Sequence, residues 1–180
     1  MRISPGVLAP PHEVLNPDEW RARGQAQRRE VPRSSHAQWD PPSDRPDPVD
    51  TLERQAKTRV SDLVPIRYGR MLTSPFAYYR GAAAPMAWDL AHTPTTDIRV
   101  QCCGDAHLLN FGMLAAPDRH LVFDVNDFDE TLPAPFDWDV KRLAASFAVA
   151  ARHNGFGDKA AHRAAKHCVS YYREQMARFA

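Results

Sequence analysis

The sequence is poor in cysteine, has no excess of charge of one sign and contains no long apolar run. Its three cysteines, Cys102, Cys103 and Cys168, are an odd number with two adjacent, so we expect reduced thiols and a cytoplasmic protein. The 23 Lys and Arg residues nearly balance the 22 Asp and Glu residues, which argues against nucleic acid and anionic membranes as partners. No run approaches the roughly 18 apolar residues of a transmembrane helix, and residues 1–14 lack the apolar stretch of a secretory signal.

Proline is unevenly distributed, because nine of the 16 prolines lie in residues 1–50. The same part of the chain is rich in Arg, Ser and Asp, a composition that buries too little apolar surface to offset the entropy of ordering. We therefore expect residues 1–48 to be a mostly disordered arm. Residues 49–180 have the apolar spacing of a globular domain.

The globular part predicts several helices. Apolar residues over 52–63 have helical spacing, and Pro65 is expected to end that segment. Ser74-Pro75 is a helix start, and the helix should run to about residue 91 with Pro85 as a kink or break. Apolar faces then predict a helix over 136–151, closing near residue 154, and another from residue 158. The apolar face of this last helix is still running at residue 180, so we expect further sequence downstream.

Two short strands are predicted between these helices. They span residues 97–103 and 120–125, and Ala-Pro-Asp-Arg at 116–119 supplies a turn. We expect the two strands to pair as a hairpin around the loop 104–119. The predicted fold is therefore α+β, mostly helical, with one short hairpin.

The segment between Gly104 and Asp139 is dense in acidic and amide side chains. It contains Asp105, His107, Asn110, Asp124, Asn126, Asp127, Asp129 and Glu130. Clustered carboxylates repel one another, and a bound divalent cation is the usual remedy. Carboxylate and amide oxygens favour Mg²⁺ or Mn²⁺ over zinc. Asp124, Asp127 and Asp129 alternate with non-acidic residues, so we expect them on one face of an extended segment. The alternative is that two of them are simply solvated.

Phosphoryl transfer needs a carboxylate beside the attacking hydroxyl, and a second carboxylate with an amide oxygen to hold Mg²⁺. Asp105 and Asn110 supply a base and a metal-facing amide from one loop, and Asp127 supplies the metal carboxylate. The predicted hairpin would bring both loops together. We expect Phe128 to anchor the second loop from beneath.

These motifs resemble a known group of enzymes. Gly-Asp-x-His-x-x-Asn at 104–110 resembles the catalytic loop of the kinase-like aminoglycoside phosphotransferases and choline kinases. Asp127-Phe128 is similar to the metal-binding Asp-Phe step of that group, and Asp139-Val140 is similar to its Asp-Leu-Ala helix start.

A longer stretch, about half of the chain, resembles a bacterial family catalogued as domain of unknown function 2252. The resemblance is carried by the segments VPIRYGRMLTSPFAYYRGAA, VQCCGDAHLLNFG and LVFDVNDFDETLPAPFDWDVKRLAAS. Together with the kinase-like motifs, this resemblance implies an incomplete domain at 49–180 whose fold is part of a protein-kinase-like C-lobe. The hairpin would carry the catalytic and metal loops.

The resemblance also implies roles for individual residues. Asp105 would be the catalytic base, with His107 bracing its loop. Asn110 and Asp127 would bind Mg²⁺ or Mn²⁺, with Asp129 as an extra contact. The implied reaction moves phosphate from ATP to a hydroxyl on an acceptor that the sequence does not identify.

Charged residues around this segment have expected structural or binding roles. An arginine near a carboxylate-rich site can bind phosphate, and we assign that contact to Arg80 ahead of Arg67 and Arg70. The alternative is that these arginines neutralise Asp139 or Glu130.

The acidic start of the helix over 136–151 has structural roles. Asp139 is expected to cap its helix or to hold the loop. Lys141 and Arg142 are expected to pair with Asp137 or Asp139.

The chain departs from the kinase pattern in one respect. Kinases carry a Gly-rich phosphate loop and a strand lysine before the catalytic loop, but only Lys57 precedes Gly104 here, and no such loop does. We expect both features downstream, so the 180 residues alone are expected to be inactive. The alternatives are a non-catalytic, truncated or degenerate binding module, or a metal-dependent phosphoesterase with Asp105 and His107 as its metal pair. The sequence leaves the oligomeric state open.

Overall fold

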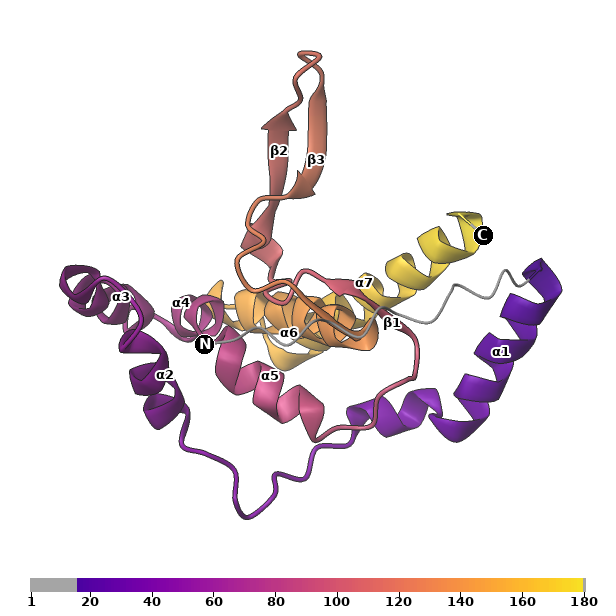
Figure 1. Ribbon diagram of the computed structural model, residues 1–180, viewed down its shortest axis with the longest axis horizontal. Coiled ribbons are helices and arrows are strands. Elements are labelled where there is room, and N and C mark those ends of the chain that lie inside the picture. The colour runs from indigo at the N-terminus through magenta and orange to yellow at the C-terminus, as the bar shows by residue number, and fades with distance from the viewer. Residues whose placement is uncertain (1–15, 180) are drawn as a thin grey trace, which may run out of the picture.

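The computed structural model describes residues 16–179 (Figure 1). The fold is α+β and mostly helical, with two small antiparallel sheets, as the sequence predicts in outline. The helices are α1 (Pro17–Glu30), α2 (Pro48–Ala56), α3 (Val64–Met71), α4 (Pro75–Gly81), α5 (Ala83–Ala91), α6 (Asp137–His153) and α7 (Asp158–Phe179). The strands are β1 (Arg99–Cys102), β2 (Phe111–Ala115), β3 (Leu121–Val125) and β4 (Leu132–Pro135).

Helix α6 is the centre of the helical body. It packs along α7 and also contacts α4 and α5, and α3 lies against α4 (Figure 1). Small side chains allow these close approaches, because Ala150 of α6 and Ala161 of α7 are both buried. The buried face of α6 also carries Arg142 and Ser146, two polar residues that must find partners inside the protein.

Most of the predicted helices are present, but some of their details differ from the prediction. Ser74 caps α4 by accepting the Ala77 N–H. The break expected at Pro85 lies instead at Ala82, between α4 and α5, and Pro85 falls in the first turn of α5. Helices α6 and α7 are present, but the buried residues of α6 are Asp137, Arg142, Ser146 and Ala150, not those of the predicted apolar face. In α7 Ala161 is buried, whereas Met176 and Phe179, at the end of the predicted face, are exposed. Pro65, however, begins α3 instead of ending a helix, because proline lacks an N–H that the first turn does not need.

The predicted pairing of the strands is wrong. β1 pairs with β4, from Arg99 opposite Pro135 to Cys102 opposite Leu132. β3 pairs with β2, which the sequence analysis treats as loop. The Ala116–Arg119 turn was placed correctly, and it closes the nearer pair of strands because a local hairpin costs less loop entropy than a distant one.

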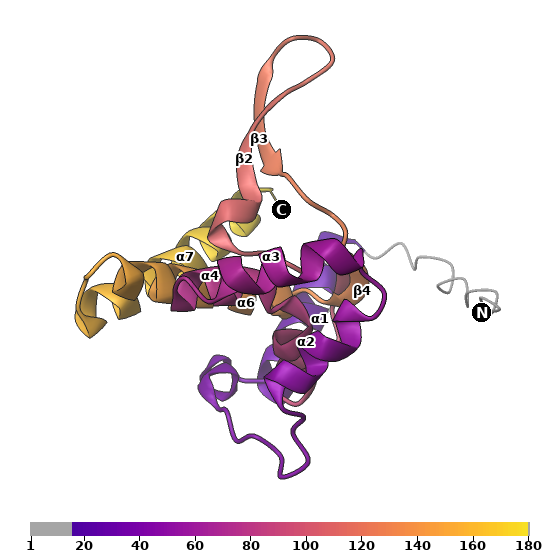
Figure 2. The same cartoon turned by 90° about the vertical axis from the view of Figure 1, so that its left-hand side faces the viewer.

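The β2–β3 hairpin stands away from the helical body (Figures 1 and 2). Its register places Met113, Phe123 and Leu121 on one face, together with Phe111 and Val125. Met113, Leu121 and Phe123 are 60%, 70% and 68% exposed. The hairpin therefore positions its base, beside the acidic loops, but contributes little to the core.

The N-terminal segment contains a helix where we expected a disordered arm. Helix α1 begins with a capping box, in which Asn16 accepts the Glu19 N–H and Glu19 accepts the Asn16 N–H. Within the described part of the chain none of its side chains is buried. Residues 1–15 of the predicted arm lie outside the described residues, and a domain boundary near residue 48 stays a prediction.

A second part of this segment is attached to the body. Arg45 donates from Nε and Nη2 to the two carboxylate oxygens of Asp89 on α5, at 2.7 and 2.8 Å. Across residues 16–179, no helix is both long enough and apolar enough to cross a membrane.

Candidate functional site

A glycine brings the two acidic loops together. Gly104 follows β1 with a φ of +82°, and a Cβ on it would lie 1.9 Å from the carbonyl oxygen of Glu130. Only glycine tolerates both the left-handed backbone and this approach. The loop over 104–110 therefore lies directly against the loop over 126–131.

Asp139 of α6 holds the start of the first loop. Its two carboxylate oxygens accept the N–H groups of Cys103 and Gly104, at 2.7 and 3.1 Å. Of the two structural roles expected for Asp139, the structure shows loop holding, and its side chain does not cap α6. The loop is thereby fixed to α6, the helix at the centre of the helical body.

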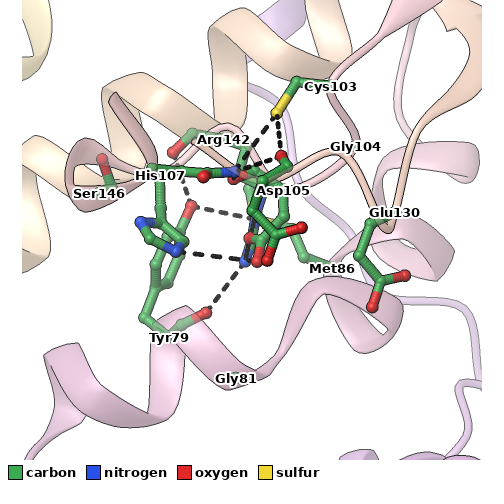
Figure 3. Close-up of polar contacts among 12 residues, drawn as sticks. Tyr79, Gly81, Met86, Cys103, Gly104, Asp105, His107, Glu130, Arg142 and Ser146 are labelled. Atoms are coloured by element: carbon green, nitrogen blue, oxygen red, sulfur yellow. Dashed lines mark hydrogen bonds and ion pairs between the residues drawn. The ribbon is translucent and has the colours of Figure 1, made fainter. Parts of the chain in front are cut away.

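The carboxylate of Asp105 is paired with Arg142, also on α6 (Figure 3). Arg142 donates from Nε, at 2.7 Å, and from Nη2 to the same oxygen, Oδ1. Asp105 Oδ2 lies 3.7 Å from His107 Nε2 and accepts no hydrogen bond from any described residue. One oxygen of Asp105 is therefore held, and the other is available.

Arg142 is in turn held by residues of α4 and α5. Its side chain is 2% exposed, and it donates to the carbonyl of Tyr79 at 3.1 Å and to Met86 Sδ at 3.3 Å. The Tyr79 hydroxyl donates to the Arg142 carbonyl at 2.7 Å, and burial raises the pKa of Tyr79 to about 12. We expected Arg142 to pair with Asp137 or Asp139, and this is wrong. Lys141 does pair with Asp137, at 3.1 Å.

His107 is buried within the first loop. Its Nδ1 accepts the Leu109 N–H at 3.1 Å, which caps the 3₁₀ helix Leu108–Asn110. Burial lowers the pKa of His107, and the charges of Arg142 and Arg80 act in the same direction, against the charge of Asp105. The imidazole is thus favoured in its neutral form, with its proton on Nε2 facing Asp105.

Asn110 joins the two loops through its amide nitrogen. Nδ2 donates to the carbonyls of Asp105 and Asp127, at 3.0 and 3.1 Å. The backbone adds a second link, because Asn126 N–H donates to the Asn110 carbonyl at 2.9 Å. Oδ1 of Asn110 accepts no hydrogen bond among residues 16–179, so the amide oxygen is the unused end of this buried side chain.

Asp127 and Asp129 lie on the exposed side of the second loop. Asp127 Oδ1 accepts the Asp129 N–H at 3.0 Å, and both side chains are exposed. Phe128 is 57% exposed, so the expectation that it anchors the loop from beneath is wrong. The loop is fixed instead by the hydrogen bond from Asn110 to the Asp127 carbonyl and by the close approach of Gly104 to the Glu130 carbonyl.

The oxygen donors expected for a cation are present in part. Within the described chain, no three His, Cys, Asp or Glu side chains gather closely enough to hold a metal ion. The predicted ligand set, however, includes the amide oxygen of Asn110, which is free, and the exposed carboxylate of Asp127. These are the hard oxygen donors that Mg²⁺ accepts, and Mg²⁺ commonly keeps water and substrate phosphate as its other ligands.

Arg80 lies on the solvent side of α4. It is exposed and forms no ion pair with the residues that the structure describes. Its charge nevertheless reaches His107, because it contributes to the lowered pKa of that residue. The assignment of a phosphate to Arg80 remains a prediction.

Comparison with known families confirms the resemblance to the bacterial family. Residues 59–180, more than half of the chain, match a bacterial family, DUF2252, described as an uncharacterized protein conserved in bacteria. The chain belongs to this family. No curated protein and no solved structure matches it. The DUF2252 match covers the site and the helices α3 to α7, and begins after α1 and α2.

Proposed function

We propose that this DUF2252 chain carries the catalytic and metal loops of a Mg²⁺-dependent phosphotransferase related to the kinase-like enzymes, which moves phosphate from ATP to a hydroxyl group. The observation that supports it most is the role of Asn110, whose amide nitrogen bonds to both loops and leaves its oxygen free. A metal-facing amide between two acidic loops is what phosphoryl transfer requires.

The residues have distinct roles on this proposal. Asp105 Oδ2 accepts a hydrogen bond from the acceptor hydroxyl and orients its oxygen toward the γ-phosphorus. As the new O–P bond forms and the bond to the ADP oxygen breaks, the hydroxyl proton passes to Oδ2. Arg142 holds Oδ1 throughout, which keeps the accepting oxygen in place.

The remaining polar groups serve the phosphates. Asn110 Oδ1 and Asp127 would hold a magnesium ion, with Asp129 beside them, and the bound ion would offset the charge of the ATP phosphates. Arg80 contacts a phosphate from the solvent side. His107 stays neutral and braces the loop through Leu109.

Thermal unfolding with Mg²⁺ and ATP tests the proposal. A ligand at about 100 times its dissociation constant adds roughly 2.7 kcal/mol to the free energy of unfolding. We expect stabilisation of the wild-type chain that Asp127→Asn removes. Asp124→Asn is the matched control, because its exposed carboxylate bonds only to the Val125 N–H, at 2.7 Å. No stabilisation of the folded wild-type chain would reject ATP binding.

A non-catalytic binding module is the second candidate, and one observation favours it. Asp105 is engaged by a buried arginine, which is also what a purely structural carboxylate does. A longer member of the family separates the two candidates. Asp105→Asn should lower its phosphate transfer by orders of magnitude without unfolding it, and unchanged transfer rejects Asp105 as the base. Phosphate release from p-nitrophenyl phosphate with Mn²⁺, without use of ATP, would instead indicate a phosphoesterase.

A further inference from the structure

Arg67 of α3 is a half-buried cation that has no counter-ion within the described part of the chain. Its Nη2 donates to the carbonyl of Gly81, at the end of α4, at 2.6 Å. Its Nη1 is closed to solvent and meets no acceptor in the described part of the chain, and Arg67 forms no ion pair there. A buried donor without an acceptor is destabilising, and more so when it is charged.

The charges around Arg67 connect it to the candidate site. Burial lowers the pKa of Arg67, and so does the neighbouring positive charge of Arg59. The carboxylates of Glu130 and Asp105 act in the opposite direction, so both lie within electrostatic reach of the guanidinium although neither pairs with it. Figure 3 shows Asp105 and Glu130 on adjacent segments, where the two acidic loops meet.

The three arginines near the site differ in how many of their N–H donors have a hydrogen-bond or ion-pair partner. Arg142 donates to Asp105, Tyr79 and Met86, so its charge is used inside the protein. Arg59 lies 3.8 Å from a carboxylate oxygen of Glu130. Arg67 alone among these three combines partial burial with an unused donor. Unsatisfied polar groups in a folded protein concentrate at functional sites.

We propose that Arg67 anchors a phosphate-binding subsite beside Asp105. A guanidinium presents paired N–H donors at the spacing of two phosphate oxygens, and it stays charged when partly desolvated. Among residues 16–179, only the hydrogen bond to the Gly81 carbonyl holds the guanidinium, and the residue as a whole is only partly buried. On binding, the guanidinium turns so that Nη1 leaves its covered position and donates to the phosphate.

This subsite rests on the proposed function in one respect, the source of its ligand. That function would supply the phosphate as part of a nucleotide or of a phosphorylated product. Its binding chemistry requires neither Mg²⁺ nor turnover. It also refines the assignment of phosphate to Arg80, because the residue after Arg80 is the one that positions Arg67.

Calorimetric titration with inorganic phosphate, in the absence of metal and nucleotide, tests the subsite. We expect the wild-type chain to bind phosphate, and Arg67→Gln to weaken binding by about tenfold or more, since a charge-assisted pair of bonds is lost. Arg67→Lys should bind with intermediate affinity, because it keeps the charge but not the fork. Arg70→Gln, an exposed arginine on the same helix, should bind as the wild type does.

Two results would overturn the subsite. They are an absence of phosphate binding to the folded wild-type chain, and an equal loss of binding in the Arg70 and Arg67 variants. If Arg67→Gln fails to fold, the phosphate affinities of Arg67→Lys and Arg70→Lys are compared instead. An equal loss of affinity in these two variants would also overturn the subsite. ATP without metal is the second titrant, and a preference for it over inorganic phosphate would assign the subsite to the nucleotide.

The outcomes remain separable from those of the proposed function. Phosphate binding without stabilisation by Mg²⁺ and ATP would reject the phosphotransferase and keep the subsite. Stabilisation by Mg²⁺ and ATP without phosphate binding, unaffected by Arg67→Gln, would reject the subsite alone.

Discussion

Arg142 donates two hydrogen bonds to a single oxygen of Asp105, and this leaves the other oxygen facing His107 at 3.7 Å. The pair joins a fully buried arginine of α6 to the loop that carries the candidate base. A carboxylate held in this way has a defined orientation before any substrate arrives. Structure and proposed chemistry therefore depend on the same ion pair.

Arg142→Met should destabilise the fold strongly. The substitution removes a cation that is 2% exposed and leaves the partly buried Asp105 without its partner. Breaking such a pair costs about 3–5 kcal/mol, and the exposure of Asp105 places the expected loss near the lower end. Urea unfolding measures it. Arg152→Met removes a pair with Asp158 that is 60% and 86% exposed, so its loss should stay below about 1 kcal/mol. Equal losses in the two variants would contradict the account.

Gly104→Ala should cost more than Gly155→Ala. Both glycines have positive φ, at +82° and +79°, so both variants carry backbone strain of about 1 kcal/mol. Only at Gly104 would the new Cβ collide with backbone, the carbonyl of Glu130, whereas nothing lies within 4 Å of a Cβ at Gly155. Denaturant midpoints of the two variants compare the costs. If Gly155→Ala is the more damaging change, the two acidic loops do not meet as described.

Asn110→Ala should loosen both acidic loops together. It leaves the carbonyls of Asp105 and Asp127 without the amide donor, at a cost of about 1–3 kcal/mol. Hydrogen exchange should accelerate in residues 104–110 and in 126–131. Asn154→Ala, at the exposed end of α6, is the control and should leave both loops protected. Acceleration in only one loop would show that the amide does not couple them.

Acidification should destabilise the protein in part through His107. Its pKa is lowered in the folded state, so the unfolded chain binds the proton more readily. The contribution to stability is complete above the ordinary histidine pKa of about 6.5 and is lost as pH falls below it. The free energy of unfolding of His107→Gln should therefore depend less on pH between about 7.5 and 5.5. The exposed His162→Gln should keep the wild-type slope, and an unchanged slope in His107→Gln would contradict the assignment.

Much of the helical fold follows from local signals. Ser74 before Pro75 and the apolar spacing of α6 and α7 predict elements that the structure contains, because capping and burial are decided within a few residues. Helix α1 was missed although Asn16 and Glu19 form a capping box. The polar, proline-rich composition of residues 1–48 favoured a disordered arm over that signal.

The pairing of strands and charges was harder to predict. β4 contains two prolines and no alternation, so nothing in its sequence marks it as the partner of β1. Arg142 was expected to pair with an acidic residue of its own helix. Its partner, Asp105, lies instead in the loop between β1 and β2. The residues of the acidic loops could be listed from the sequence, but what holds them could not.

Paramagnetic broadening by Mn²⁺ tests most directly whether the two acidic loops share one cation. Mn²⁺ accepts the same oxygen ligands as Mg²⁺, and nuclear magnetic resonance signals near it broaden first. We predict broadening at Asn110, including its side-chain amide, and at Asp127 and Asp129, with loss of the effect in Asp127→Asn. Broadening confined to other acidic positions, or equal broadening in Asp127→Asn, would contradict the account.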